Sequence, residues 1–579
     1  MAADGAPVDS SDPHVHPEVA VVPSLPDPAA VERPWVAAYP PGVPPSYDLP
    51  KVALGRFLDD AARDFSDRAA LVTDAATIDH ETLHDRVGAV ASVLHELGVA
   101  AGERVLLLLP DHGTTPVVLF AVWRLGAVAV PLPPTSEIDD VAAVFADAAP
   151  TALIAEPAML ERLVSQPALW PRVVVAVDGA EWPSTRRGRR LAARRRRRRR
   201  RHEDDDTVVE LADELERLGD HRSVPPGPTP DDPALLAYPP QPSQLGAAVL
   251  THANLVANAF QVRLWIPDVQ AGKERVLVAD PLHEPLGLTL GLLSGMLAGA
   301  TVIVLADPDG PHLAAAIDRE RPTLVFLGPQ HLAGVVAAPS RRDLTSVRVC
   351  LTLGGPVDAD VAAALEERTG SARVREGYGL REAAALTHAQ PVYGRVETQS
   401  MGLPVTDTVA MVVDLDDLAT PLSAGQPGML VVAGPQVATG TWGETRRART
   451  QLHEGWLVTG DVVNVTADGV FHHVGRASEL VRREGILVAP RHVEEVIERH
   501  DAVDRAVVTV VDGPELVASV VRRRRPRADA EQLLAHCRSH LAHPAVPDRI
   551  ELVDELPTTP AGEVARDELH RQLTGGKPT

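Results

Sequence analysis

The sequence has 579 residues, 45% of them hydrophobic, which is long enough for two or more domains with buried cores. Its formal net charge of -23 argues against general binding of nucleic acid, because an acidic chain repels a polyanion. The chain has two cysteines, Cys350 and Cys537, so a disulfide framework or a cysteine-rich metal site is excluded and a reducing cytoplasm is expected.

Residues 1–45 are rich in proline and acidic residues and show little periodicity. They lack the basic and then apolar pattern of an export signal, and we predict a flexible leader. The most apolar window, residues 276–305, is interrupted by Asp280, His283, Glu284 and several glycines. It therefore predicts buried strands and helices instead of a membrane span.

From residue 52 onward, strand patterns alternate with helix patterns, which indicates an α/β fold with parallel strands. The first series has predicted helices at residues 54–65, 81–97 and 115–125, and predicted strands at 69–72, 104–109 and 127–131. A helix is predicted at residues 208–218. A second series has predicted strands at 276–279, 301–305, 323–328 and 347–353, and predicted helices at 287–297, 313–319 and 359–369.

Short strands and turns predict a β-rich portion at residues 402–440, and the last hundred or so residues form an α/β unit of their own. The expected architecture is a large N-terminal domain of two α/β sheets plus a β-rich subdomain. A small, mobile α+β C-terminal domain would follow it.

A low-complexity segment at residues 184–206 interrupts the first series. It contains eight consecutive arginines, residues 194–201, and four acidic residues at 203–206. Self-repulsion favours an exposed loop, so we predict a solvated insertion without function. The alternative is a contact with anionic lipid, which would be at most a peripheral membrane contact. Nucleic-acid binding is disfavoured because the run lacks interleaved aromatic residues.

Three motifs lie in register along the chain. The first is AYPPQPSQLGAAVLTHANLVAN at residues 237–258, and the second is EGYGLRE at residues 376–382. The third is GWLVTGD at residues 455–461, followed by DG at 468–469 and GR at 475–476. A strand-to-helix corner would explain the second motif alone, but an acidic turn does not explain the full spacing of the third.

With these motifs the chain resembles the AMP-forming acyl ligases, the superfamily of acyl-CoA synthetases, luciferases and peptide-synthetase adenylation domains. Its opening ERPW, residues 32–35, is similar to the start of actinobacterial long-chain fatty-acyl-CoA ligases. The resemblance covers residues 34–573. It implies a two-step reaction, in which a fatty carboxylate attacks ATP to give acyl-AMP and pyrophosphate, and coenzyme A then takes the acyl group.

The resemblance assigns nucleotide binding to Tyr378, Asp461, Arg476 and Thr251. Tyr378 would stack on the adenine. Asp461 would accept both ribose hydroxyls, since an ionised carboxylate can accept two hydrogen bonds, and Arg476 would support the same sugar. Glu382 would hold Mg²⁺ through its carboxylate, a hard oxygen ligand suited to that ion.

Departures from the family pattern gather where the triphosphate would bind. The family loop YTSGTTGxPKG is replaced by YPPQPSQLG at residues 238–246, one position shorter and without the lysine. Pro239, Pro240 and Pro242 remove N–H donors that a phosphate cradle needs. Arg381 replaces the family threonine and is the one candidate cation that the motif register places near the phosphates, either as an anion binder or in a salt bridge to an acid such as Glu382.

Two further departures concern reactive groups. The resemblance places Glu284 at the histidine that borders the acyl site, with His283 shifted by one position. It places Glu563 at the lysine that would bridge the substrate carboxylate and the α-phosphate, where an acid repels both anions. Ser478 occupies the family's hinge position, and Gly485 alone remains of the glycine pair that coenzyme A passes.

From the resemblance we expect a ligase domain at residues 46–474, a C-terminal domain at 475–573 and a tail at 574–579. The implied small molecules are a fatty acid, ATP or AMP, and coenzyme A, with Mg²⁺. Losing one preorganised donor typically costs about 10²–10³ in rate, so we predict impaired adenylation. The alternatives are a pseudo-ligase that binds AMP, an acyl-adenylate or a protein partner, and an enzyme that only forms the thioester from a supplied adenylate.

Overall fold

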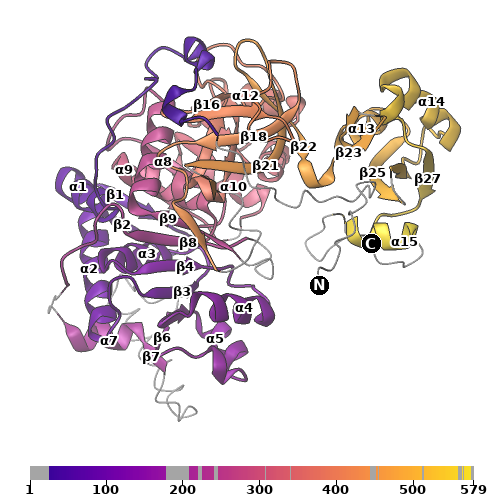
Figure 1. The fold of residues 1–579 in the computed structure, drawn as a ribbon. Helices are drawn as coiled ribbons and strands as arrows, with labels where there is room; N and C mark the ends of the chain where they lie inside the picture. Colours follow the sequence, from indigo (N-terminus) through magenta and orange to yellow (C-terminus); the bar gives the residue numbers. More distant parts are fainter. Residues whose placement is uncertain are drawn as a thin grey trace, which may run out of the picture.

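The computed structural model describes residues 25–177, 208–219, 224–239, 246–306, 308–339, 341–443, 452–453, 455–484, 486–511, 514–557, 564 and 566–574. These residues form a large N-terminal portion of sheets and helices and a smaller C-terminal portion beside it (Figure 1). The predicted α/β class is confirmed. The predicted arginine insertion at 184–206 lies outside the described residues, as do Gly485 and Glu563.

The first sheet has eight strands in the order β19-β9-β8-β4-β3-β5-β6-β7. The strands from β8 to β7 are parallel, whereas β9 and β19 add antiparallel at one edge. The strands are β3 (Arg104–Leu108), β4 (Val128–Pro131), β5 (Ala152–Ala155), β6 (Val173–Ala176), β7 (Val208–Glu210), β8 (Pro233–Ala237), β9 (Ala247–Thr251) and β19 (Gly440–Trp442). The associated helices are α2 (His80–Glu96), α3 (Thr114–Arg124), α4 (Ile138–Ala148), α5 (Pro157–Leu163) and α7 (Leu211–Leu218). Strands β3 to β6 are short runs of mostly Val, Leu, Ile and Ala, because helices cover both faces of a parallel sheet.

The second sheet has nine strands in the order β16-β15-β14-β13-β12-β10-β11-β1-β2. Its central strands are parallel, and the carboxyl ends of parallel strands share one edge, where α/β proteins commonly bind ligands. The strands are β1 (Ala69–Val72), β2 (Thr77–Asp79), β10 (Arg275–Val278), β11 (Thr301–Val304), β12 (Leu324–Phe326), β13 (Val349–Thr352), β14 (Arg373–Leu380), β15 (Ala385–Ala389) and β16 (Leu403–Pro404). The associated helices are α1 (Gly55–Phe65), α8 (His252–Trp265), the π-helical η5 (Gly287–Leu293), α9 (Ser294–Leu297), α10 (Gly310–Glu320), α11 (Pro329–Ala337) and α12 (Ala359–Thr369).

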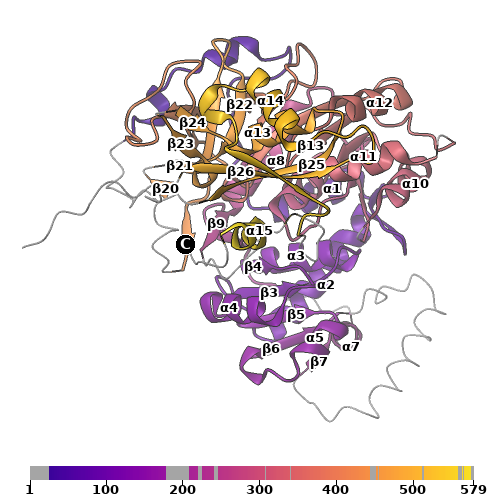
Figure 2. The same cartoon turned by 90° about the vertical axis from the view of Figure 1, so that its right-hand side faces the viewer.

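A third, antiparallel sheet overlaps the β-rich portion predicted at residues 402–440 and extends beyond it to Arg476. It contains β17 (Val409–Val413), β18 (Gly428–Ala433), β20 (Leu452–His453), β21 (Trp456–Val465) and β22 (Phe471–Arg476). The C-terminal portion follows and has a hydrophobic core of its own (Figure 2). Its elements are β23 (Val481–Arg483), β24 (Ile486–Val488), α13 (Pro490–Glu498), β25 (Val503–Val511), β26 (Glu515–Arg522), α14 (Ala530–His540), β27 (Arg549–Val553) and α15 (Arg566–Leu573).

Helix α8 joins the second sheet to the β-rich portion through three buried amides, Asn254, Asn258 and Gln261. Asn254 Nδ2 donates to two carbonyls of the loop after β18, at 2.8 and 2.9 Å. Asn258 exchanges hydrogen bonds with the backbone of Leu386 in β15, and Gln261 Nε2 donates to the carbonyl of Thr406 at 2.7 Å. Buried polar groups need partners, so these bonds hold three elements in one arrangement.

Part of the predicted flexible leader is packed. Trp35 is 3% exposed and its ring meets Phe471 edge-on, while Leu25 is 6% exposed and lies in the cluster around Trp456. Tyr39 donates from its hydroxyl to the carbonyl of Pro404 at 2.5 Å. The prediction of flexibility is therefore wrong for residues 25–45, because their aromatic and apolar side chains have a core to enter.

Most predicted elements of the two series match the observed ones to within a few residues. The helix predicted at 208–218 begins at Leu211, because residues 208–210 pair with β6 as β7. The helix predicted at 287–297 begins as η5, a π-helical stretch. In the part of the chain that is described, no helix is both long enough and apolar enough to cross a membrane.

Candidate functional site

Asp461 is the centre of a polar cluster between β14, β21 and β22. Register pairs Asp461 with Arg476 across the two antiparallel strands, and Arg476 Nε forms an ion pair with Asp461 Oδ1 at 3.2 Å. Tyr378, near the end of β14, donates from its hydroxyl to Asp461 Oδ2 at 2.5 Å. The structure thus brings three of the sequence-predicted nucleotide residues into direct contact.

Asp461 is held as an anion although its side chain is only 4% exposed. Burial alone would raise its pKa. The hydrogen bond from His473, the charge of Arg476 and the hydroxyl of Tyr378 outweigh burial, so the pKa of Asp461 lies below its ordinary value. For Tyr378, burial and the Asp461 charge hold the pKa well above its ordinary value, so the phenol stays protonated and can donate.

His473 in β22 is a member of this cluster that the motifs did not identify. Its Nε2 lies 3.3 Å from Asp461 Oδ1, and its ring centroid is 6.5 Å from that of Tyr378. His388 packs on the Tyr378 ring at 5.9 Å, is fully buried, and has a pKa lowered to about 3 by burial. Strand alternation would not have found His473, because it lies three residues from Arg476 and a regular strand would place the two on opposite faces. The register of β21 and β22 shifts between Val462 and Val463, which the motifs do not reveal.

Arg381 and Glu382 form the turn directly after β14. Arg381 Nη1 donates to the carbonyl of Tyr238 at 3.3 Å, and its Nε lies 3.5 Å from Glu382 Oε1. Tyr238 is the residue at which the altered loop begins. Arg381 therefore contacts the first residue of the loop and also the acid that was its alternative partner.

The altered loop connects two antiparallel strands, β8 and β9. The described residues at its ends are Tyr238, Pro239 and Gly246, whereas Pro240 and Pro242 lie outside the described residues. Tyr238 is 7% exposed and donates from its hydroxyl to Asp147 Oδ2 of α4 at 2.5 Å. Tyr238, at the start of the loop, thus forms hydrogen bonds with α4 beside the first sheet and with Arg381.

Thr251, which the resemblance assigned to the nucleotide, is used locally in this structure. It is the N-cap of α8, and its Oγ1 accepts from the backbone N–H of Asn254 at 3.2 Å. The Asn254 side chain in turn accepts from the Thr251 N–H at 2.9 Å, which completes a capping box. Thr251 is 5% exposed. In this structure it caps α8, the helix whose buried side-chain amides bond to the neighbouring elements.

His283 and Glu284 lie after β10, at the carboxyl edge of the second sheet. Burial lowers the pKa of His283 to about 4, so this imidazole is neutral. Burial raises the pKa of Glu284, and the positive charge of Arg381 partly opposes that shift. The acid at the predicted acyl position is thus close enough to the candidate cation to interact with it.

Two further buried acids accompany this segment, and sequence reasoning assigned them no role. Burial raises the pKa of Asp280 to about 7, although a hydrogen bond from the Gly328 N–H acts to lower it. Among the described residues, Asp280 Oδ2 has no hydrogen-bond partner. Burial likewise raises the pKa of Asp111 to about 6, although its Oδ1 accepts from the Leu282 N–H at 3.1 Å. Burial thus favours the protonated form of these two acids, whereas Asp461 is held as an anion.

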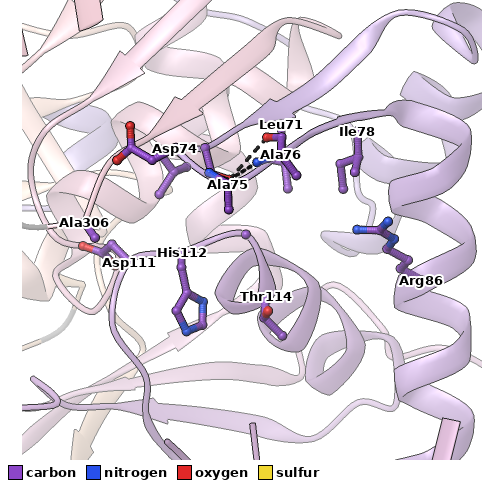
Figure 3. Close-up of a pocket in the computed structure, with 13 residues that line it drawn as sticks. Leu71, Asp74, Ala75, Ala76, Ile78, Arg86, Asp111, His112, Thr114 and Ala306 are labelled. Carbon is purple, nitrogen blue, oxygen red and sulfur yellow. Dashed lines mark hydrogen bonds between the residues drawn. The ribbon is translucent and has the colours of Figure 1, made fainter. Parts of the chain in front are cut away.

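Asp111 also lines a small cavity of about 120 Å³ between the β1–β2 turn, α2 and the start of α3 (Figure 3). Arg86 extends from α2 toward the cavity, while the His112 ring turns away from it toward α5, where it contacts Glu156 at 3.2 Å. The rest of the lining is mainly apolar. This cavity is separate from the Asp461 cluster, and Asp111 links it to the segment that carries His283.

Ser478 is exposed in the short η8 turn (Ala477–Glu479) between β22 and β23. The C-terminal portion begins directly after it, as its assignment as a hinge requires. One exposed ion pair, Arg482 to Asp416 at 3.1 Å, joins the two portions nearby. Farther along, Arg566 binds Glu494 of α13 through two nitrogens, at 2.8 and 2.9 Å, which fixes the chain after the segment that holds Glu563.

Comparison with known proteins agrees with this arrangement. Residues 58–442 match the model of the family described as AMP-binding enzyme, and residues 492–563 match the AMP-binding enzyme C-terminal domain. A long-chain-fatty-acid–CoA ligase of Bacillus subtilis is 28% identical over 94% of this chain and 98% of its own length. A feruloyl-CoA synthase of Amycolatopsis is 31% identical over 85% and 93%. The structure of ATP-bound MatB from Rhodopseudomonas palustris matches with a TM-score of 0.75 at 22% identity, covering 91% of this chain and all of that one.

Proposed function

Because the chain belongs to the family of AMP-binding enzymes, we propose that it is an acyl-CoA ligase that acts on a long-chain fatty acid and adenylates it poorly. In the full reaction the carboxylate attacks the α-phosphate of ATP, giving acyl-AMP and releasing pyrophosphate. The thiol of coenzyme A then attacks the acyl carbon, giving the thioester and releasing AMP. The long-chain-fatty-acid–CoA ligases among the relatives support this substrate class.

The observation that carries the proposal is the ionised, hydrogen-bonded Asp461. Two of its partners, Tyr378 and Arg476, are the residues assigned to the adenine and the ribose, so one carboxylate organises the nucleoside end of the site. On binding, the ribose hydroxyls would donate to Asp461. The Tyr378 hydroxyl would then share Asp461 with them or donate to another acceptor. This end supplies binding and positioning, which are the main sources of catalysis in such a reaction.

The phosphate end is the reason to expect slow adenylation. Arg381 contacts Tyr238, the residue at which the altered loop begins, and its charge also interacts with Glu382 and Glu284. Pro239 supplies no N–H at the start of the loop. Electrostatic stabilisation of developing charge commonly contributes more to such catalysis than any other effect, so a neutralised cation and missing donors slow adenylation more than they weaken AMP binding.

Magnesium fits Glu382 as a single carboxylate ligand, with an exposed fraction of 20%. Within the described residues, no group of three or more His, Cys, Asp or Glu side chains could hold a metal. Mg²⁺ keeps several waters and is usually bound through one or two carboxylates plus substrate phosphates, so one carboxylate would be enough. When bound, the ion would neutralise phosphate charge. Glu382 would orient it, at the cost of its contact with Arg381.

A second candidate function is that of a pseudo-ligase that holds AMP, an acyl-adenylate or a protein partner without adenylation. The observation that favours it is the acidic surrounding of the acyl side, where Asp111, Asp280 and Glu284 are half-buried and burial raises the pKa of each. An enzyme limited to thioester formation from a supplied adenylate is the intermediate case. Ser478 as the hinge and Gly485 beside the path of coenzyme A are proposals that apply to both ligase forms.

Pyrophosphate release with fatty acids of different chain lengths tests the proposal, with AMP and ATP binding measured by calorimetry beside it. We expect slow release and AMP binding at least as tight as ATP binding. Replacing residues 239–246 with the family loop, together with Glu563→Lys, should release more pyrophosphate than either change alone, because both act on one transition state. Thioester formation from synthetic acyl-AMP and coenzyme A separates the candidates. Absence of both reactions with retained AMP binding would leave the pseudo-ligase.

A further inference from the structure

His473 belongs to the Asp461 cluster, but none of the three sequence motifs assigns it a role. Its Nε2 lies 3.3 Å from Asp461 Oδ1. An ionised carboxylate can only accept a hydrogen bond, so Nε2 carries the proton and donates it. The side chain of His473 is 40% exposed, and it can therefore turn away from Asp461 into solvent without burying an unpaired nitrogen.

The contacts of Asp461 leave room for one ribose hydroxyl and not for two. Each carboxylate oxygen has about two lone-pair directions. At Oδ1, His473 Nε2 lies at 3.3 Å and Arg476 Nε at 3.2 Å, so both directions are taken. At Oδ2, the Tyr378 hydroxyl takes one direction at 2.5 Å. A ribose that donates both of its hydroxyl groups to this carboxylate must therefore displace one of the three partners.

Of these partners, His473 is the one whose loss costs least. Tyr378 makes the shortest contact, and its ring packs against the fully buried His388. Arg476 lies directly opposite Asp461 in the strand register, and its permanent charge balances the carboxylate. His473 makes the longest of the three contacts, and a neutral imidazole removes no charge from the cluster when it leaves.

We propose that His473 is a positioning residue that holds the Asp461 carboxylate until the ribose of an adenine nucleoside displaces it, so that protonation of His473 opposes nucleoside binding. An imidazolium donates a charge-assisted hydrogen bond, which is roughly twice as strong as that of a neutral imidazole. Histidine ordinarily changes charge between about pH 5 and 8, so nucleoside affinity should rise with pH across this range. The inference rests on the proposed function, because it takes the ligand to be an adenine nucleoside.

The other titratable groups of the cluster keep one charge across this range. The pKa of Asp461 lies below its ordinary value, because its partners outweigh burial, so the carboxylate stays an anion. Burial and the Asp461 charge hold the pKa of Tyr378 well above its ordinary value, so the phenol stays neutral. Burial lowers the pKa of His388 to about 3, so this imidazole stays neutral too. A pH dependence of nucleoside affinity therefore reports on His473.

The test is calorimetry of adenosine binding at pH 5 and pH 8. Adenosine is the probe because it lacks the phosphate of AMP, since a phosphate monoester itself changes charge near a pH of about 6. The wild type should bind adenosine about fivefold more tightly at pH 8 than at pH 5, because a charged donor holds the carboxylate more strongly than a neutral one. His473→Gln keeps a neutral donor, so it should lose this dependence and bind adenosine at pH 5 about fivefold more tightly than the wild type. A merely structural role would not improve binding.

The matched control is His472→Gln, because the neighbouring histidine contacts Glu397 at 3.2 Å instead of Asp461, and this variant should keep the wild-type profile. 2′-Deoxyadenosine supplies one hydroxyl in place of two, so the wild type should bind it equally well at both pH values. A flat profile for adenosine, a dependence that His473→Gln retains, or an equal dependence for 2′-deoxyadenosine would overturn the inference and leave the nucleoside site in place. No binding of adenosine at either pH would refute the proposed nucleoside site and the inference with it.

Discussion

The nucleoside end and the phosphate end of the candidate site are built on the same strand, β14, but their charges are arranged in opposite ways. At the nucleoside end, one carboxylate, Asp461, is surrounded by donors from Tyr378, Arg476 and His473. At the phosphate end, one cation, Arg381, lies among the acids Glu382 and Glu284.

The difference shows why one half of a site can remain suited to its ligand while the other does not. Asp461 has a lowered pKa because its donors outweigh burial, so it stands ready to accept from hydroxyl groups. The acids near Arg381 have no comparable set of donors, and burial raises the pKa of Glu284. A neutral ribose gains from the first arrangement, whereas in the second the cation that would attract a triphosphate is already paired with Glu382.

The largest expected effect tests the nucleoside end. Asp461→Ala should weaken AMP binding about 100-fold, because hydrogen bonds to a charged group contribute about 1.5–3 kcal/mol each and Arg476 and His473 would lose their acceptor. Calorimetry measures the change. Asp468→Ala, at an exposed turn of the same sheet, is the control and should leave AMP binding unchanged. Equal affinity in both variants would remove Asp461 from the nucleotide site.

The next effect tests the phosphate end. Arg381→Thr should weaken ATP binding by about tenfold and AMP binding by less than about twofold, since losing a charge-assisted contact costs on the order of 1.4 kcal/mol. Arg381→Lys keeps a positive charge and should recover part of the ATP affinity. If Arg381→Thr leaves the ratio of ATP to AMP affinity unchanged, the arginine serves only its contacts with Tyr238 and Glu382.

A smaller effect concerns the buried acids and follows from the pKa of Asp280, which is about 7 against an ordinary value of about 3.9. Between these values the folded state keeps a proton that the unfolded state releases, so stability falls as the pH rises from about 4 to 7. Asparagine cannot ionise, so the stability of the Asp280→Asn variant should fall less over this pH range, by on the order of 1–2 kcal/mol. Thermal unfolding at pH 5 and pH 8 measures it. An identical pH dependence in the variant would contradict the raised pKa.

The smallest effect separates helix capping from nucleotide contact at Thr251. Thr251→Ala should lower stability by about 1 kcal/mol through loss of the N-cap of α8, while AMP affinity changes by less than about twofold. Thr251→Ser keeps the hydroxyl and should restore most of the stability. A large loss of AMP affinity in a folded Thr251→Ala variant would instead support the nucleotide role that the resemblance assigned.

Much of the site was predictable because its parts are local motifs. The EGYGLRE and GWLVTGD motifs identified Tyr378, Asp461 and Arg476, and the structure brings these residues together. The superfamily and the α/β fold were also predicted correctly. The roles of these three residues toward a nucleotide remain predictions, as do those of Ser478 and Glu563, and Glu563 lies outside the described residues.

The sequence by itself determined the periodicity, the motif spacing and the positions that depart from the family pattern, since each of these depends on residues close together in the chain. Only the tertiary structure decided which distant charges meet. His473 reaches Asp461 through strand pairing, and Arg381 reaches the Tyr238 carbonyl across 143 positions of sequence. Burial likewise arises only in the fold, so the raised pKa values of Asp111 and Asp280 could not be read from composition or spacing.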